Sequence, residues 1–141
     1  MAVVYFDASA LVKLVVREQG SALASALYNR ADLAVTSRIS DIEVRAALAA
    51  AQHTGLLDAR SHAEVIASWQ RLWPSLAVVE MGNRVARVAA ELLAASPVPL
   101  RAGDALHVAS AQAVAHPETI VAAWDERVAS GARAQSLRVL P

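Results

Sequence analysis

Short runs of apolar residues alternate along the chain with longer segments in which apolar positions recur at helical spacing. The short runs are continuously apolar, which is typical of strands that are buried on both faces of a sheet. On this basis we predict five strands, over residues 2–6, 33–36, 77–79, 119–123 and 137–140.

The longer segments predict seven helices. Within residues 37–53, for example, Ile39, Ile42, Ala46 and Ala50 fall on one helix face. The expected helices cover residues 9–16, 21–29, 37–53, 58–72, 83–95, 102–115 and 125–130. Strands that alternate with helices favour a parallel sheet covered on both faces, so the predicted fold class is α/β. The pattern leaves the strand order open.

The composition fits one compact domain. The 141 residues are 56% hydrophobic and 18% charged, which excludes a disordered chain, and no repeat or linker divides them. We therefore predict a single domain over residues 1–141. The absence of cysteine excludes disulfides, thiolate metal sites and a cysteine nucleophile. A formal net charge of +0 gives no global attraction for nucleic acid, although a local basic rim could still hold phosphates.

No apolar stretch approaches the ~20 residues that a membrane helix needs. The first residues, MAVVYFDAS, lack the basic region of a signal peptide. We therefore expect a cytoplasmic protein with no membrane partner.

Four acidic residues stand where a solvated surface charge is not expected. Asp7 directly follows the first predicted strand, and Asp125 follows the apolar run TIVAAW at another strand end. Asp104 lies at the start of the helical segment GDALHVASAQAV, and the neighbours of Glu43 on its helix face are isoleucine and alanine. Each has a structural alternative, because an Asp at a helix start can cap it and Glu43 could reach solvent or pair with a basic residue.

Together the four carboxylates predict a metal site. In parallel sheets, sites gather at the carboxyl ends of the strands. Carboxylates in one cleft repel one another, and such a cluster persists at neutral pH when cations neutralise it. Oxygen ligands without cysteine or a histidine motif select Mg²⁺ or Mn²⁺, and ions held in this way serve phosphodiester hydrolysis. Ser9 could hold a water or a phosphate there, or simply cap the first helix.

Four segments resemble the acidic blocks of the PIN-domain nucleases and, more narrowly, of the VapC toxin ribonucleases of bacterial toxin–antitoxin pairs. They are YFDASALVKL, TSRISDIEVRAAL, RAGDALHVASA and AAWDERVASGA, which occur in this order along the whole chain. The resemblance implies a three-layer α/β/α sandwich with a central, mostly parallel sheet. It also implies an acidic pocket that binds Mg²⁺ or Mn²⁺ through Asp7, Glu43, Asp104 and Asp125.

The same resemblance implies a reaction and its partners. The expected activity is that of a metal-dependent endoribonuclease that hydrolyses RNA, often a structured tRNA or rRNA loop. The expected protein partners are a small VapB-type antitoxin, whose C-terminal segment crosses the active-site groove, and a second copy in a homodimer. Asp7 and Asp104 match the best-defined blocks, Glu43 would complete the ligand set, and Asp125 would act as a ligand or through a bound water.

Three residues near these acids carry open interpretations. Ala123 stands where many relatives carry Thr or Ser, which leaves the second metal site in question. His107, one helical turn after Asp104, is interpreted as a histidine that packs in the core or supports a ligand. Trp124 could stack on a base, or pack in the core or in a dimer.

Basic residues follow the acidic blocks closely and could rim the cleft, where they would contact phosphate. Lys13 and Arg38, together with Ser9, are the candidates for substrate binding. The full basic set is Lys13, Arg17, Arg38, Arg101 and Arg127.

Two rival functions remain. A haloacid-dehalogenase-like phosphohydrolase also has a nucleophilic Asp after its first strand, but it needs a second Asp near position 9 and a later lysine. This chain has Ser9 and no lysine beyond Lys13, which counts against that class. The other rival is a catalytically silent PIN-fold module that binds a protein partner. The four acids argue against lost activity, and Ala123 leaves the question open.

Overall fold

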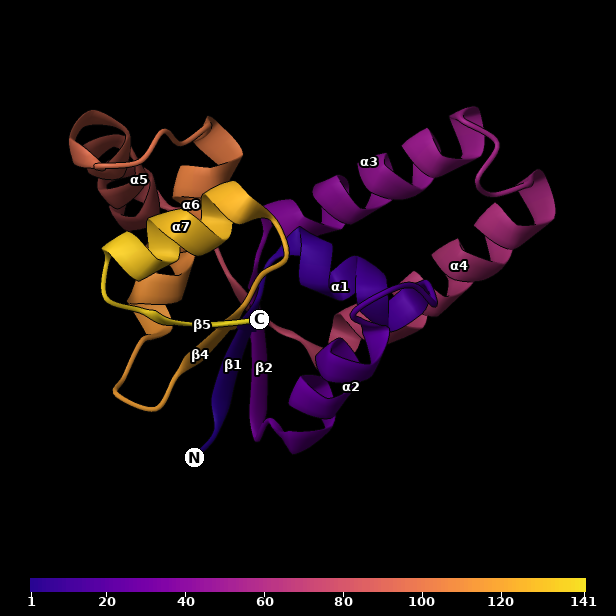
Figure 1. Cartoon of the computed structure of the whole chain (residues 1–141), viewed down its shortest axis with the longest axis horizontal. Coiled ribbons are helices and arrows are strands. Elements are labelled where there is room, and N and C mark those ends of the chain that lie inside the picture. The colour runs from indigo at the N-terminus through magenta and orange to yellow at the C-terminus, as the bar shows by residue number, and fades with distance from the viewer.

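A five-stranded parallel sheet forms the centre of the molecule (Figure 1). The computed structural model describes all 141 residues. The strands are β1 (Val3–Phe6), β2 (Leu33–Ser37), β3 (Ala77–Val79), β4 (Ile120–Ala122) and β5 (Arg138–Leu140). They lie in the order β3-β2-β1-β4-β5, and every neighbouring pair is parallel. All five predicted strands are confirmed, each to within about one residue at either end.

Helices cover both faces of the sheet, which confirms the three-layer α/β/α sandwich (Figure 1). Figure 1 shows α3 and α4 extending as a hairpin away from the sheet. None of the helices has the length and apolar character needed to cross a membrane. One layer contains α1 (Ala8–Val15), α2 (Ser21–Arg30), α3 (Ile39–His53), α4 (Ala59–Leu72) and the 3-10 turn η1 (Trp73–Ser75), and the other contains α5 (Asn83–Ala95), α6 (Ala102–Val114) and α7 (Glu126–Ala134).

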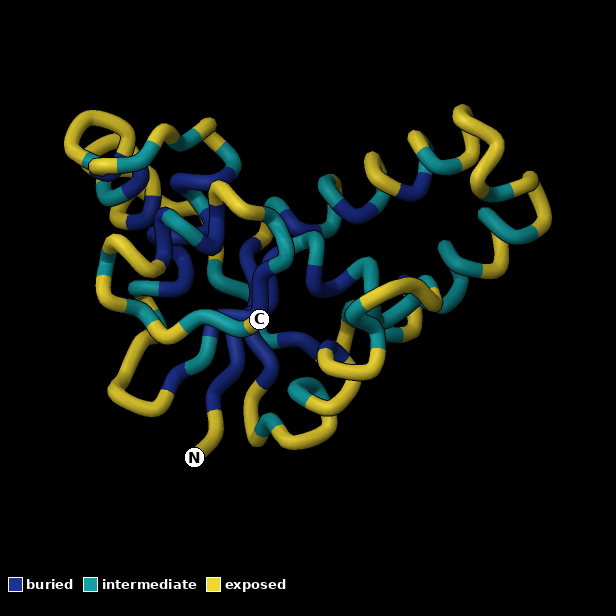
Figure 2. Tube along the Cα trace, viewed as in Figure 1, coloured by how far each residue is buried: buried dark blue, intermediate teal, exposed yellow.

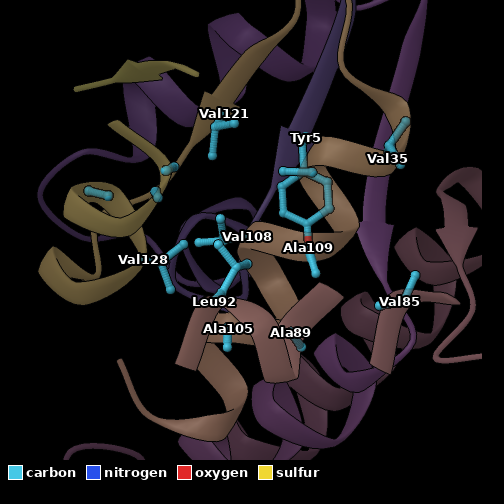
Figure 3. Packing of buried hydrophobic residues seen from close by; sticks show 14 of the residues in the cluster. Tyr5, Val35, Val85, Ala89, Leu92, Ala105, Val108, Ala109, Val121 and Val128 are labelled. Carbon is cyan, nitrogen blue, oxygen red and sulfur yellow. The ribbon is translucent and has the colours of Figure 1, made fainter. Parts of the chain in front are cut away.

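Successive side chains of β1 enter two different hydrophobic cores. Val3 and Tyr5 pack against α5, α6 and α7 (Figure 3), whereas Val4 and Phe6 pack against α1, α3 and α4. A strand that is apolar at every position is buried in this way on both faces, because successive side chains point to opposite sides. In Figure 2 the buried segments concentrate in the central strands and α6, and the tip of the α3–α4 hairpin is exposed.

The predicted buried face of α3 is wrong. The apolar pattern that includes Ile42 predicts a face turned to the core, but Ile42 is 68% exposed. The helix instead buries Ser40, Val44 and Leu48. The Ser40 hydroxyl bonds to that of Thr36 on β2 at 2.7 Å, and Val44 and Leu48 join the core beside α1 and α4. These contacts fix which side of α3 faces inward.

The last helix is longer than its predicted range, since α7 continues to Ala134 through Gly131. A Cβ atom at Gly131 would lie 2.8 Å from Leu100 Cδ2 and 3.2 Å from Val108 Cγ2. This glycine therefore allows α7 to pack closely against α6, and it does not end the helix.

Candidate active site and metal centre

The candidate site lies at the carboxyl ends of β1 and β4, which are neighbours at the centre of the sheet. Phe6 and Ala122 are partners in the register of these strands. Asp7 follows Phe6 directly, and Asp125 lies just beyond the end of β4. The chain builds β2 and β3 on one side of β1 and then returns to build β4 and β5 on the other. Open parallel sheets bind their ligands at such a change of direction.

Asp7 both ends β1 and caps α1. Its Oδ1 accepts a hydrogen bond from the backbone N–H of Ala10 at 2.9 Å and from the Ser9 hydroxyl at 2.6 Å, while Oδ2 takes part in neither bond. The residue is 1% exposed, and this burial raises the pKa of Asp7 to about 6 against the lowering effect of His107, Ser9 and Ala10. The negative charge of Asp7 is therefore poorly solvated, and a nearby cation would stabilise it.

Ser9 joins the ends of the two central strands. Its hydroxyl donates to Asp7 and accepts from the backbone N–H groups of Trp124 at 2.9 Å and Asp125 at 3.0 Å. Because α1 begins at Ala8 and Asp7 is its cap, the interpretation of Ser9 as the N-cap is wrong. The three bonds use the full capacity of a hydroxyl and hold the segment of Asp125 beside Asp7.

The guanidinium of Arg101 bridges Asp104 and Asp125. The Arg101 backbone N–H donates to Asp104 Oδ2 at 2.7 Å, and its Nε donates to the same oxygen at 3.2 Å. Its Nη2 lies 3.4 Å from Asp104 Oδ1 and 3.5 Å from Asp125 Oδ2. Asp125 also caps α7, since its Oδ1 accepts from the backbone N–H groups of Arg127 and Val128. From sequence, Arg101 was only one of several expected rim cations.

Glu43 is held by a chain of buried polar groups. His107 Nε2 lies 2.5 Å from Glu43 Oε1, and the Tyr5 hydroxyl lies 2.8 Å from His107 Nδ1. A carboxylate only accepts, so Nε2–H donates to Glu43. In the neutral imidazole Nδ1 accepts from the Tyr5 hydroxyl, and in the protonated imidazole Nδ1–H donates to it. Burial raises the pKa of Tyr5 well above its usual value, so this hydroxyl is protonated.

This chain of groups shows what Glu43 and His107 contact, and it adds a third residue. Glu43 pairs with a basic residue across the core, and His107 supports a candidate metal ligand. The role of the Tyr5 hydroxyl was missed from sequence. A tyrosine in a strand buried on both faces needs a partner for its hydroxyl, and this requirement was the available signal.

The donor set fits a hard cation such as Mg²⁺ or Mn²⁺. All candidate donors are carboxylate oxygens, and neither Asp7 Oδ2 nor Glu43 Oε2 accepts a hydrogen bond from the protein. Asp104 Oδ1 and Asp125 Oδ2 contact only the Arg101 guanidinium. In this arrangement of side chains, no three Asp, Glu or His residues are spaced closely enough to bind one ion together.

Lys13 is held by contacts within the protein. Its Nζ donates to Glu18 at 3.0 Å and to the backbone carbonyl of Gln19 at 2.7 Å, and it lies 5.3 Å from the centroid of the Trp124 ring. Trp124 packs against Gly20, where a Cβ atom would lie 2.7 Å from the indole Nε1 and where φ is +92°. The core-packing interpretation therefore holds for Trp124.

Arg38 is also paired with an acidic residue. Its guanidinium forms an ion pair with Glu80 and lies 5.7 Å from the centroid of the Trp73 ring. The side chains of Arg17 and Arg127 form no ion pair with an acidic residue. A phosphate that binds Lys13 or Arg38 thus has to compete with Glu18 or Glu80.

Comparison with known proteins identifies the family. Residues 4–132 match the PIN domain, and this range contains all four candidate acids. The chain is 45% identical over 141 residues to Ribonuclease VapC49 of Mycobacterium tuberculosis (strain ATCC 25618 / H37Rv), and the alignment covers 100% of this chain and 96% of that protein.

Solved structures share the fold at low sequence identity. A toxin–antitoxin complex from Klebsiella pneumoniae matches with a TM-score of 0.66 at 16% identity, over 98% of this chain and 96% of that one. Mycobacterium tuberculosis VapC20, a Sarcin-Ricin loop cleaving toxin, matches with a TM-score of 0.66 at 16% identity, over 87% of this chain and 90% of that one. The chain belongs to the PIN domain family and, within it, to the family of the VapC ribonucleases.

Proposed function

We propose that this chain is a Mg²⁺- or Mn²⁺-dependent endoribonuclease that acts, as a single domain, as the toxin of a type II toxin–antitoxin pair. The observation that carries the proposal is the meeting of acidic side chains from distant parts of the sequence at one end of the central sheet. Ser9 links Asp7 to the segment of Asp125, and Arg101 links Asp125 to Asp104.

The proposed metal-binding and catalytic residues are Asp7, Glu43, Asp104 and Asp125. A divalent ion bound there supplies a Lewis acid, which lowers the pKa of a coordinated water and stabilises the leaving oxygen. The protein's own contribution is to hold the carboxylates in place. Ser9 and His107 perform this task for Asp7 and Glu43 through hydrogen bonds of 2.6 and 2.5 Å.

The proposed substrate is a structured RNA such as a tRNA or rRNA, which would place the activity in the cytoplasm. Support comes from the relatives, because VapC49 is a ribonuclease and VapC20 cleaves the Sarcin-Ricin loop. Ser9, Lys13 and Arg38 are the proposed substrate contacts. With all three bonds of the Ser9 hydroxyl made inside the protein, Lys13 and Arg38 are the stronger candidates for direct phosphate contact.

Reversing the charge of Arg38 should weaken RNA binding. In a cleavage-deficient background, Arg38→Glu is expected to raise the Kd for RNA and to reduce the slope of log K against log salt by about 1, because one phosphate contact is lost. Fluorescence anisotropy over a salt series measures both quantities. Arg60→Glu is the matched control, since Arg60 is also paired with an acid, Glu64, but lies on the α3–α4 hairpin. A slope equal to that of the unaltered protein would contradict the Arg38 assignment.

Metal should stabilise the folded protein. Millimolar Mg²⁺ or Mn²⁺ is expected to raise the melting temperature, because an ion that binds only the folded state at about 100 times its Kd adds about 2.7 kcal/mol. Differential scanning fluorimetry over a metal series measures the shift. Asp7→Asn should lose most of it, and a melting temperature that does not respond to either metal would count against the site.

We propose a VapB-type antitoxin and a second copy of the chain as protein partners. The antitoxin is supported by the fold shared with the Klebsiella pneumoniae toxin–antitoxin complex and by the VapC relationship. The homodimer is supported by apolar side chains that the monomer leaves uncovered, such as Ile42 on α3 at 68% exposed and Leu93 on α5 at 49% exposed.

One observation favours the alternative of a silent PIN-fold module. Ala123 is buried and offers a methyl group where the resemblance to PIN-domain nucleases leads us to expect a hydroxyl. Under that alternative, the folded protein would bind its protein partner but would cleave no RNA in Mg²⁺ or Mn²⁺. Assays of binding and cleavage on one preparation separate the two functions.

A further inference from the structure

Arg101 is the one basic side chain in the molecule that contacts two of the four candidate metal-binding acids. Its Nη2 lies 3.4 Å from Asp104 Oδ1 and 3.5 Å from Asp125 Oδ2. The Arg101 side chain is 63% exposed, whereas that of Asp104 is 7% exposed. A solvent-facing cation thus covers a buried anion.

The start of α6 does not depend on this guanidinium. Asp104 Oδ2 accepts from the backbone N–H of the N-cap residue Arg101 at 2.7 Å, and this bond involves no guanidinium atom. The longer side-chain contacts, at 3.2 to 3.5 Å, add charge neutralisation and no cap. The side chain can therefore turn away while α6 stays in place.

The oxygens that Arg101 contacts belong to two of the four carboxylates of the proposed metal site. Asp104 Oδ1 and Asp125 Oδ2 have no other partner in the protein. A guanidinium and a divalent cation a few ångströms apart repel each other. The two cations therefore compete for contact with the same two carboxylate oxygens, and they exclude each other at these two carboxylates.

We propose that Arg101 is a built-in counter-cation that competes with the divalent metal ion for Asp104 and Asp125. In the metal-free protein its guanidinium neutralises the two carboxylates, and on metal binding it turns out to solvent. Arg101 thereby sets the metal concentration at which the site fills. This inference rests on the proposed function, because it takes the acids to be metal ligands.

The test is a calorimetric titration of Mn²⁺ into Arg101→Gln, which keeps the backbone bond to Asp104 and removes the cation. We expect the Kd for Mn²⁺ to fall about threefold to tenfold, as two partly exposed ion pairs no longer oppose binding. The metal-free variant should also melt at a lower temperature than the unaltered protein. Arg101→Lys, which keeps the charge without the fork of donors, should bind Mn²⁺ with an intermediate Kd.

Arg127→Gln is the matched control, because it removes the same charge near Asp125 from a side chain that pairs with no carboxylate. Its Kd for Mn²⁺ should stay close to that of the unaltered protein. An Arg101→Gln affinity that is unchanged, weaker, or matched by Arg127→Gln would overturn the proposal. If Arg101→Gln does not fold, an Arg101→Lys affinity equal to or weaker than that of the unaltered protein overturns it as well.

Asp7→Asn separates this proposal from the proposed function. If Mn²⁺ binds the unaltered protein and not Asp7→Asn, while Arg101→Gln changes nothing, the competition is wrong and the metal site stands. If no form of the protein binds Mn²⁺, the metal site and the competition fail together.

Discussion

Asp7→Asn is expected to abolish RNA cleavage, with a loss of about 10³-fold or more, while the protein stays folded. Asparagine keeps an Oδ1 that can accept from Ala10 and Ser9, so the cap and the link to the second strand end survive. The charge that holds the metal is lost, and with it several kcal/mol of electrostatic stabilisation of the transition state. Cleavage of total RNA by purified protein in Mn²⁺ measures the effect.

Asp58→Asn is the matched control for this substitution. Asp58 also caps a helix, since its side chain accepts from the backbone N–H of Ser61 at 2.7 Å, but it lies at the exposed tip of the α3–α4 hairpin. The Asp58→Asn protein should cleave RNA at the rate of the unaltered protein. Equal losses of cleavage activity in the two variants would show that replacing any helix-capping Asp lowers the activity. Loss of a metal ligand would then not be the explanation.

Asp7→Asn should also stabilise the metal-free protein at neutral pH. Burial raises the pKa of Asp7 from 3.8 to about 6, so the folded state binds this proton more tightly than the unfolded state does. The stability that this proton provides is complete below about pH 3.8 and is lost as the pH rises through about 6. At pH 7, ionisation of the buried Asp7 carboxyl therefore lowers the free energy of unfolding by about 3 kcal/mol.

Asparagine does not titrate, so Asp7→Asn should unfold at higher urea than the unaltered protein at pH 7, and the difference should shrink towards pH 4. Urea unfolding in EDTA at both pH values measures this. If Asp7→Asn instead unfolds at lower urea than the unaltered protein at pH 7, the negative charge of Asp7 stabilises the metal-free fold, and the burial argument is wrong.

His107→Ala is expected to lower the free energy of unfolding by about 3 kcal/mol. It opens a cavity in the core and leaves the buried Tyr5 hydroxyl and the Glu43 carboxylate without their partner. Urea unfolding at pH 7 measures the loss. His53→Ala, at the exposed end of α3, should change stability by no more than about 0.5 kcal/mol. His107→Gln can keep part of the hydrogen bonding, so its loss of unfolding free energy should lie between those of the other two variants. A loss below about 1 kcal/mol for His107→Ala would contradict the structural role of the hydrogen bonds that join Tyr5, His107 and Glu43.

Much of the fold was predictable because the strands of a doubly covered parallel sheet are continuously apolar. The face of α3 was not, since Ile42 and Val44 give this helix apolar residues on more than one side. A small contact, the bond between Ser40 and Thr36, helps to decide which side is buried. The end of α7 was missed because Gly131 serves close packing, which the local sequence does not reveal.

The candidate acids were identifiable because each stands out locally, at a strand end, at a helix start or beside apolar neighbours. Their partners were not, because those contacts join distant parts of the chain. The bond from His107 to Glu43 spans 64 positions, and the bond from Tyr5 to His107 spans 102. In the sequence Arg101 resembles four other basic residues near the acids, and only the fold brings it between Asp104 and Asp125.

The most direct test of the proposed nuclease is to sequence RNA 5′ ends after brief expression of the unaltered chain and of Asp7→Asn in bacterial cells. We expect new ends at one or a few defined positions in a tRNA or rRNA with the unaltered chain, and none of them with Asp7→Asn. The same new ends in both samples, or no new ends from a folded, unaltered protein, would contradict an endoribonuclease whose metal site is built on Asp7.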